Sequence, residues 1–230
     1  MKLEVLPDSA AVALRAAQFV AAEARTTAAA RGRFSFAVSG GRTPWQMLRA
    51  LAGEDVPWNA VHLFQVDERI APAGDPDRNL THIGESLLVR GKLPPAQLHA
   101  MPVDVQDVSA AAARYARELE NVAGAPPVLD LIHLGLGTDG HTASLVPGDP
   151  ALDVTRDEVT VTTVYQRHRR MTLTFPTLNR ARRILWLVTG AEKQPMLARL
   201  RAGDPSIPAG RVRREDALIL ADAEAAGGTP

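Results

Sequence analysis

The sequence predicts an α/β fold built on a mostly parallel β-sheet that is covered by helices on both faces. Apolar strand-like runs alternate along the chain with amphipathic helical stretches, which is the order of βαβ units. Residues 129–134 and 184–188 are predominantly apolar, as in strands buried on both faces. Residues 159–164 and 171–175 instead alternate in polarity, which predicts a small antiparallel insertion around residues 155–175.

The expected strands are short apolar or β-branched segments bounded by turn-forming residues. In chain order they are residues 2–6, 34–38, 61–66, 129–134, 159–164, 171–175, 184–188 and 217–220. The second ends at a glycine pair, and the third ends at a cluster of charged residues that we expect to form a loop.

The expected helices follow from propensity, spacing and first-turn signals. In chain order they are residues 9–31, 44–52, 79–89, 108–122 and 192–201. The first is rich in alanine, the residue with the highest helix propensity. Pro44 fits the first turn of the second, where its missing N–H costs nothing, and Asn79 is expected to cap the third. Apolar residues of the fourth recur at helical spacing.

Composition excludes several classes of protein. The chain has 230 residues, which predicts one domain spanning 1–230. With 46% hydrophobic and 23% charged residues it is a typical globular chain and not a disordered or coiled-coil one. The 26 basic residues balance 26 acidic ones, which argues against a nucleic-acid partner. The chain has no cysteine, which excludes disulfides and thiolate chemistry, and no long apolar run, so we expect a cytoplasmic protein without a membrane partner.

Ligands of open α/β sheets bind beyond the carboxyl ends of the strands, so three loops are candidates for the site. The first follows residues 34–38 and contains Ser39, Gly40, Gly41, Arg42 and Thr43. Its glycines allow a tight turn, and the free N–H groups of the following helix start attract anions. The loop is either a phosphate site or an ordinary strand-to-helix turn.

The second loop begins with Asp67, Glu68 and Arg69, directly after a buried strand. These charges either line the crevice at the strand ends or are solvated. In the third loop, Gly135, Gly137 and Gly140 match the glycine spacing of dinucleotide-binding folds. That fingerprint should open a substantial helix, whereas prolines and a glycine at 147–150 interrupt the chain.

The polar residues of the third loop suggest different chemistry. Asp139 and His141 lie two residues apart, and a histidine is the natural general base near neutral pH. The nearby carboxylate can orient the imidazole. His133 lies inside an apolar strand and is expected to be a hydrogen-bonded core residue. No histidine pair has the spacing of metal ligands, so we predict no metal site.

Two basic residues complete the candidate set. Arg170 begins an alternating strand, where it is either solvated or binds a carboxylate or phosphate. Lys193 begins a helix, where a cation opposes the helix dipole. A cation at that place suggests an anionic ligand, although a surface lysine is the ordinary alternative.

Five stretches together resemble the glucosamine-6-phosphate isomerase/6-phosphogluconolactonase family, and within it the lactonase branch. They are SGGRTP at 39–44, DERIAP at 67–72, LGLGTDGHTASLVP at 134–147, RMTLT at 170–174 and TGAEK at 189–193. The resemblance implies a three-layer αβα fold with a Rossmann-like, mostly parallel sheet. It also implies hydrolysis of 6-phospho-D-glucono-1,5-lactone to 6-phospho-D-gluconate, without metal or cofactor, by a monomer or small homo-oligomer whose partner is the phosphorylated sugar lactone.

The resemblance also implies roles for individual residues. His141 would be the base that activates water, assisted by Asp139. The substrate would be bound by Ser39, Gly40, Gly41, Arg42, Thr43, Asp67, Arg69, Asn79, Gly137, Arg170 and Lys193. Two positions depart from the family pattern: Arg42 replaces a small hydroxyl residue, and Arg78 replaces the serine that usually precedes Asn79.

The deaminase branch of the family is the alternative. It has a glutamate seven residues after the aspartate of Asp-Gly-His, and this chain has Val146 there. It also has a tyrosine after the Asp-Glu pair, where this chain has Arg69. Both differences favour the lactonase. A dinucleotide-binding module is a distant third, because only the glycine spacing supports it.

Overall fold

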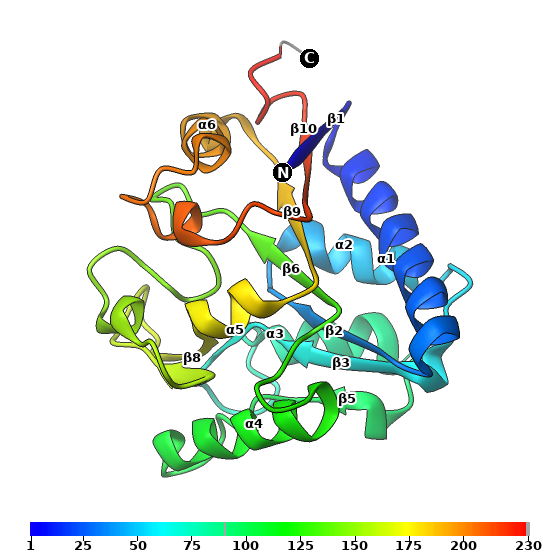
Figure 1. Ribbon diagram of the computed structural model, residues 1–230, viewed down its shortest axis with the longest axis vertical. Helices are drawn as coiled ribbons and strands as arrows, with labels where there is room; N and C mark the ends of the chain where they lie inside the picture. The colour runs from blue at the N-terminus through cyan, green and yellow to red at the C-terminus, as the bar shows by residue number, and fades with distance from the viewer. Residues whose placement is uncertain (90, 229–230) are drawn as a thin grey trace.

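A seven-stranded parallel sheet forms the centre of the protein, whose computed structural model describes residues 1–89 and 91–228 (Figure 1). Its strands are β1 (Lys2–Leu6), β2 (Phe34–Val38), β3 (Val61–Gln65), β5 (Leu98–His99), β6 (Leu131–Gly135), β9 (Arg183–Val188) and β10 (Ala217–Asp222). Their order across the sheet is β1-β10-β9-β6-β2-β3-β5, and every neighbouring pair is parallel. The predicted mostly parallel sheet is therefore confirmed.

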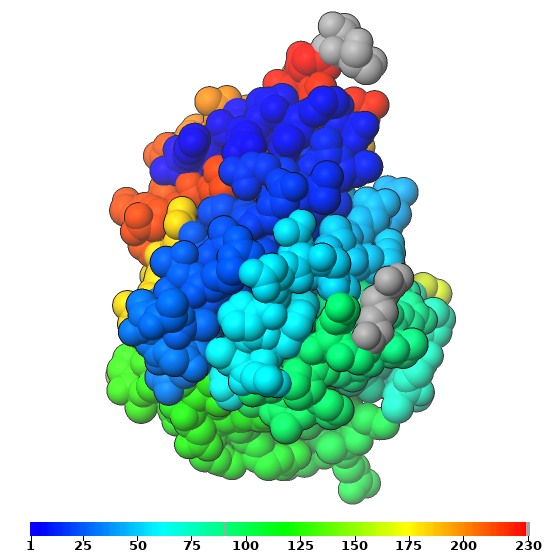
Figure 2. Space-filling view, turned by 90° about the vertical axis from the view of Figure 1, so that its right-hand side faces the viewer, coloured from blue at the N-terminus to red at the C-terminus, as the bar shows by residue number. Residues whose placement is uncertain are grey.

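Helices cover both faces of this sheet, so the predicted αβα layering is also confirmed (Figure 1). One face packs against α1 (Ser9–Arg31), α2 (Arg42–Leu51) and α3 (Asn79–Ile83), and the other against α4 (Val108–Ala123), α5 (Phe175–Arg180) and α6 (Gln194–Ala202). Figure 2 shows the first face, with the N-terminal region that includes α1 in dark blue. Within the described residues, no helix has both the length and the apolar character needed to cross a bilayer.

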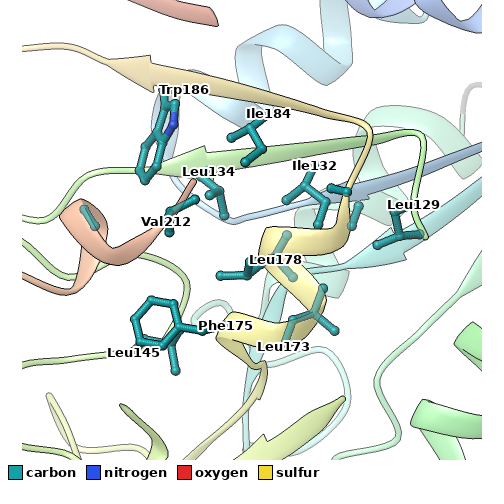
Figure 3. Packing of buried hydrophobic residues seen from close by; sticks show 14 of the residues in the cluster. Leu129, Ile132, Leu134, Leu145, Leu173, Phe175, Leu178, Ile184, Trp186 and Val212 are labelled. Carbon is teal, nitrogen blue, oxygen red and sulfur yellow. The ribbon is translucent and has the colours of Figure 1, made fainter. Parts of the chain in front are cut away.

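The apolar core consists of two clusters, one on each side of the sheet. In Figure 3, Trp186 of β9 and Leu134 of β6 lie on the same side of the sheet as Leu178 of α5. All three side chains are fully buried, and burial of a large apolar side chain stabilises the fold by about 1.5–3 kcal/mol. These strands are therefore rigid supports for the loops that follow them.

Helix α1 has the predicted ends because both are fixed locally. The Asp8 carboxylate accepts a hydrogen bond from the Ala11 N–H at 2.8 Å, which satisfies one of the unpaired donors of the first turn. Gly32 then adopts a left-handed conformation, with φ at 74°, and ends the helix as C-terminal glycines commonly do.

A second sheet of three antiparallel strands, β4 (Asp67–Arg69), β8 (Arg170–Leu173) and β7 (Val159–Val161), confirms the predicted insertion. The sequence led us to expect a loop at Asp67–Arg69, and that expectation is wrong. The segment pairs with β8, and Glu68 is completely buried, because main-chain and side-chain donors surround its carboxylate.

Other boundaries also differ from the predictions, such as the strand expected at 159–164, which ends at Val161, and the strand expected at 171–175, which ends at Leu173 before α5 begins at Phe175. Helix α2 begins at Arg42, two residues before Pro44. The helix expected at 79–89 is α only to Ile83 and continues as a π-helical segment over Gly84–Leu88. Asn79 is the first helical residue and not the cap, because its side chain bonds to β4 instead.

The strand order places a topological switch point between β2 and β6. From β2 the chain proceeds outward through β3 to β5, whereas from β6 it proceeds the other way through β9 to β10. In open α/β sheets, the crevice at the carboxyl ends of such a strand pair is the usual ligand site. The loops after β2 and β6 are the glycine-containing loops singled out in the sequence.

Candidate active site

A cavity of about 290 Å³ lies at this switch point. Most of the predicted site residues line it: Ser39, Gly40, Gly41, Arg42, Thr43, Asp67, Arg69, Asn79, Gly137, His141 and Lys193. The structure thus brings together segments from all three candidate loops and from the start of α6. Asp139 lies behind His141 and does not line the cavity, and Arg170 lines an adjoining recess of about 50 Å³.

The loop after β2 presents a helix start to the cavity. Gly41, with φ at 130°, adopts a backbone conformation that favours glycine and lets α2 begin at Arg42 without a side-chain cap. The first N–H groups of a helix have no partners within it, so they are available to an anion. Thr43 fixes the start of α2 to the loop after β9, since its Oγ1 lies 2.9 Å from Oγ1 of Thr189.

A buried histidine holds the beginning of this loop. The Ser39 N–H donates to Nδ1 of His133 at 3.3 Å, and the Ser39 hydroxyl donates to the His133 carbonyl at 3.2 Å. Burial lowers the pKa of His133 to about 3, so the ring is neutral and Nδ1 accepts. The predicted role of His133 as a hydrogen-bonded core residue is confirmed.

Asn79 packs directly against the same loop. A Cβ atom at Gly40 would overlap the Asn79 side-chain amide, so only glycine fits there without rearrangement. The main-chain N–H of Asn79 donates to Glu68 at 2.8 Å, and its side-chain N–H donates to the Asp67 carbonyl at 2.9 Å. Its Oδ1 accepts from Arg69 at 3.0 Å. Asn79 therefore connects the loop between β2 and α2 (residues 39–41) to β4.

Antiparallel pairing brings two arginines to the same end of the site. Arg69 of β4 is the register partner of Arg170 of β8. Both line the small recess, together with Asp67 and His141. Burial lowers the pKa of Arg170, although the nearby Asp67 carboxylate opposes this shift. A guanidinium that is partly desolvated in this way interacts strongly with an anionic ligand.

His141 is held by the carboxylate of Asp139. Its Nδ1 lies 2.5 Å from Oδ1 of Asp139, and its main-chain N–H donates to the same oxygen at 3.1 Å. Burial alone would raise the pKa of Asp139, but these hydrogen bonds and the neighbouring imidazole lower it overall. With Nδ1 occupied by an anionic acceptor, Nε2 is the nitrogen available for proton transfer. Gly137 contacts the ring so closely that a Cβ there would overlap it.

Three cations, Arg42, Arg69 and Lys193, and two carboxylates, Asp67 and Glu192, line the cavity. Within residues 1–89 and 91–228, neither Arg42 nor Lys193 forms an ion pair. The helix expected at 192–201 begins two residues later, at Gln194, and Lys193 ends a short 3₁₀ turn, Ala191–Lys193, directly before it. Two cations and a helix start are suited to bind a phosphate dianion.

Some residues of the site were not predicted. The Ser144 hydroxyl donates to Oδ2 of Asp67 at 2.7 Å, and the Tyr165 hydroxyl donates to Oδ2 of Asp139 at 3.0 Å. Ser144 belongs to the long glycine-containing motif, which could have indicated it. No sequence signal points to Tyr165, because it approaches Asp139 from 26 residues away. In the part of the chain that the structure describes, no cluster of histidine and acidic side chains is arranged to bind a metal ion.

Comparison with known families and proteins agrees with this geometry. The family model described as glucosamine-6-phosphate isomerases/6-phosphogluconolactonase matches residues 7–220. The 6-phosphogluconolactonase of Nostoc sp. strain PCC 7120 is 34% identical over 231 residues, which cover 97% of this chain and 96% of that protein. The 6-phosphogluconolactonase of Mycobacterium tuberculosis is 36% identical over 242 residues, with 99% and 98% covered.

Solved structures share the same architecture. The 6-phosphogluconolactonase of Thermotoga maritima superposes with a TM-score of 0.85 at 28% identity, covering 96% of this chain and 98% of that one. A monomeric glucosamine-6-phosphate deaminase superposes with a TM-score of 0.86 at 19% identity, covering 99% of each chain. The second likeness shows the shared fold alone.

Proposed function

Since this chain belongs to the glucosamine-6-phosphate isomerase/6-phosphogluconolactonase family, we propose that it hydrolyses 6-phospho-D-glucono-1,5-lactone to 6-phospho-D-gluconate in the oxidative pentose phosphate pathway. The near full-length similarity to 6-phosphogluconolactonases supports this substrate. The observation that supports the chemistry best is the pair Asp139–His141, whose imidazole lines a cavity with a helix start and cations on its other walls.

The proposed mechanism begins with the phosphate group. The N–H groups at the start of α2, together with Lys193 and Arg170, bind the dianion, which fixes the lactone ring in the cavity. Because the phosphate is at the other end of the substrate from the lactone carbonyl, binding it fixes the position and orientation of the ring before the reaction. The carbonyl carbon is thereby presented to a water molecule beside His141.

His141 then acts as the general base. Nε2 accepts a proton from the water as the water oxygen bonds to the lactone carbonyl carbon. Main-chain N–H groups of the glycine-containing loops are the proposed donors to the tetrahedral oxyanion. When the oxyanion collapses, the bond from the carbonyl carbon to the ring oxygen breaks, and that oxygen takes the proton from His141. One water is consumed, and the product has one new carboxyl and one new hydroxyl group.

We propose that this hydrolysis needs neither a metal nor an organic cofactor. The lactone is an activated ester, so a water activated by a base is a sufficient nucleophile and no covalent intermediate with the enzyme is required. Asp139 stabilises the imidazolium that forms when His141 accepts the proton. Activity that persists unchanged after exhaustive chelation is the expected result. Location in the cytoplasm and a monomeric or small oligomeric state remain predictions from the sequence.

The test is the rate of acid release from freshly prepared phosphogluconolactone, above the spontaneous rate. We expect His141→Ala to lower turnover by about 10²–10⁴-fold and Lys193→Ala to raise KM with a smaller effect on turnover. Wild-type turnover in His141→Ala would show that the base is assigned wrongly. Release of ammonia from glucosamine 6-phosphate, without lactone hydrolysis, would favour the deaminase branch instead.

A further inference from the structure

Tyr165 lies in a strained hairpin between β7 and β8. Its main-chain N–H donates to the His168 carbonyl at 3.0 Å, and the His168 N–H donates back at 3.3 Å. The two residues between them, Gln166 and Arg167, have φ values of 46° and 74°. Tight two-residue hairpins of this kind normally use glycine or asparagine, and left-handed conformations are costly for longer side chains. Backbone strain of this sort is a reason to ask what the turn positions.

The hairpin places the Tyr165 hydroxyl beside Oδ2 of Asp139, the carboxylate oxygen that does not contact His141. That hydroxyl donates to Oδ2 at 3.0 Å, while Oδ1 of the same carboxylate bonds to Nδ1 of His141 at 2.5 Å. The two carboxylate oxygens therefore have different partners, and the carboxylate cannot rotate without losing one of them. The Tyr165 ring also meets the His141 ring edge-on, with centroids 5.6 Å apart and planes at 67°.

The aromatic ring of Tyr165 has a second neighbour in the site. The guanidinium carbon of Arg170 lies 5.0 Å from the ring centroid, within the range of cation–π interactions. Arg170 and Tyr165 line the same recess beside His141. One side chain thus contacts both the proposed phosphate-binding arginine and the carboxylate that holds the proposed base.

We propose that Tyr165 is a positioning residue with two separable actions: its hydroxyl orients the Asp139–His141 pair, and its ring orients Arg170. The inference deepens the proposed lactonase function and rests on it. The lowered pKa of Asp139, to which the hydrogen bond from Tyr165 contributes, agrees with a carboxylate that stays ionised in this arrangement. A tyrosine that only filled space would make neither directed contact.

Two substitutions separate these actions. Tyr165→Phe removes the hydroxyl and keeps the ring, so we expect kcat to fall about 10-fold while KM changes less than about 2-fold. Tyr165→Leu removes both, so KM should also rise by about 5-fold or more, in line with the loss of a cation–π contact to a buried guanidinium. Val164→Ala, at an exposed position of the same hairpin, is the matched control and should behave as wild type.

A double-mutant cycle tests whether the hydroxyl acts through Asp139. In an Asp139→Asn background, Tyr165→Phe should lower kcat by less than about 2-fold, because the pair it orients is already broken. Nitrogen-15 NMR of the His141 ring, which requires no substrate, should show the tautomer protonated at Nδ1 in the wild type. The other tautomer should become more populated in Tyr165→Phe.

The outcomes distinguish a failure of the proposed lactonase function from a failure of the proposed positioning role of Tyr165. If the wild type does not hydrolyse the lactone, the proposed function fails, and the NMR measurement still tests the positioning of His141. If the wild type is active but Tyr165→Phe matches it in kcat, KM and tautomer population, the positioning role of Tyr165 is refuted. Additive effects of the Asp139 and Tyr165 substitutions would likewise overturn it.

Discussion

Replacing Gly137 by alanine should inactivate the site while the fold remains intact. The added Cβ would overlap the His141 ring and lie 2.6 Å from Oδ1 of Asp139, closer than real Cβ contacts. The loop cannot easily retreat, because the Gly137 N–H donates to the His141 carbonyl at 2.8 Å. The imidazole must therefore move. A displacement of about 1 Å can cost about 10²-fold in rate, so we expect kcat to fall by at least that factor.

The stability of this variant should change much less than its activity. Gly137 is not among the glycines with positive φ, so alanine adopts its backbone conformation without strain. The lower entropy of the unfolded chain then stabilises by about 0.4–1 kcal/mol, and local overpacking opposes this by about 1–3 kcal/mol. Because the side chains of His141 and Asp139 are 27% and 35% exposed, they can shift toward solvent and relieve most of the overlap.

The assay is the rate of acid release from the lactone, measured with the free energy of unfolding in urea on the same samples. Gly84→Ala is the matched control: no atom would lie within 4 Å of its Cβ, and Gly84 does not line the cavity, so it should keep full activity. Wild-type kcat in a folded Gly137→Ala protein would refute the idea that close contact with this glycine places the His141 ring.

Three other sets of contacts in the structure give further predictions. Gly40→Ala should raise KM about 10-fold, because its Cβ would displace the Asn79 amide from the cavity wall; an unchanged KM in steady-state kinetics would contradict this. Glu68→Gln should lower the free energy of unfolding by about 3–5 kcal/mol in urea titrations, because the N–H groups of Asn79 and Leu80 and the Arg78 guanidinium lose their carboxylate partner. An unchanged unfolding midpoint would contradict this. Hydrogen bonds from Ser206 lower the pKa of Asp204 from 3.8 to about 2, so this carboxylate stabilises the fold above about pH 4 and stops doing so as the pH falls toward 2. Stability should therefore decline less steeply across that window in Asp204→Asn, and equal slopes would be the contrary result.

Local signals predicted the large sheet and its first helix well. Helix α1 has the expected ends because Asp8 and Gly32 fix them through contacts within a few residues. Six of its seven strands differ from their expected limits by at most two residues, and the central ones are apolar runs because burial on both faces requires apolar side chains. Strand β5 was not predicted, because its two residues, Leu98 and His99, carry no strand pattern.

The small sheet was harder to predict because its first strand is charged. Asp67–Arg69 resembles a loop, and it becomes a strand only because distant donors satisfy Glu68 and because β8 pairs with it. Helix α5 was missed because its first residue, Phe175, continues the alternating pattern of the preceding strand. In both cases long-range contacts outweigh local preference.

The members of the candidate site were predictable, but their connections were not. Motifs in three loops and at the start of α6 identified most of the residues that line the cavity. Sequence order could not show that Arg69 and Arg170 are register partners, or that Tyr165 bonds to Asp139. These relations depend on how the hairpin of the small sheet lies beside the loop after β6.

The neutral imidazole of His133, which holds the loop between β2 and α2, has a consequence for the acid tolerance of the site. A ring that gains its proton only near pH 3 continues to accept the Ser39 N–H throughout the range in which cells live. Mild acidification therefore leaves the hydrogen bond between Ser39 and His133, which holds the beginning of the loop after β2, in place. Protonation of His133 is therefore not a source of pH dependence near neutrality in this part of the site.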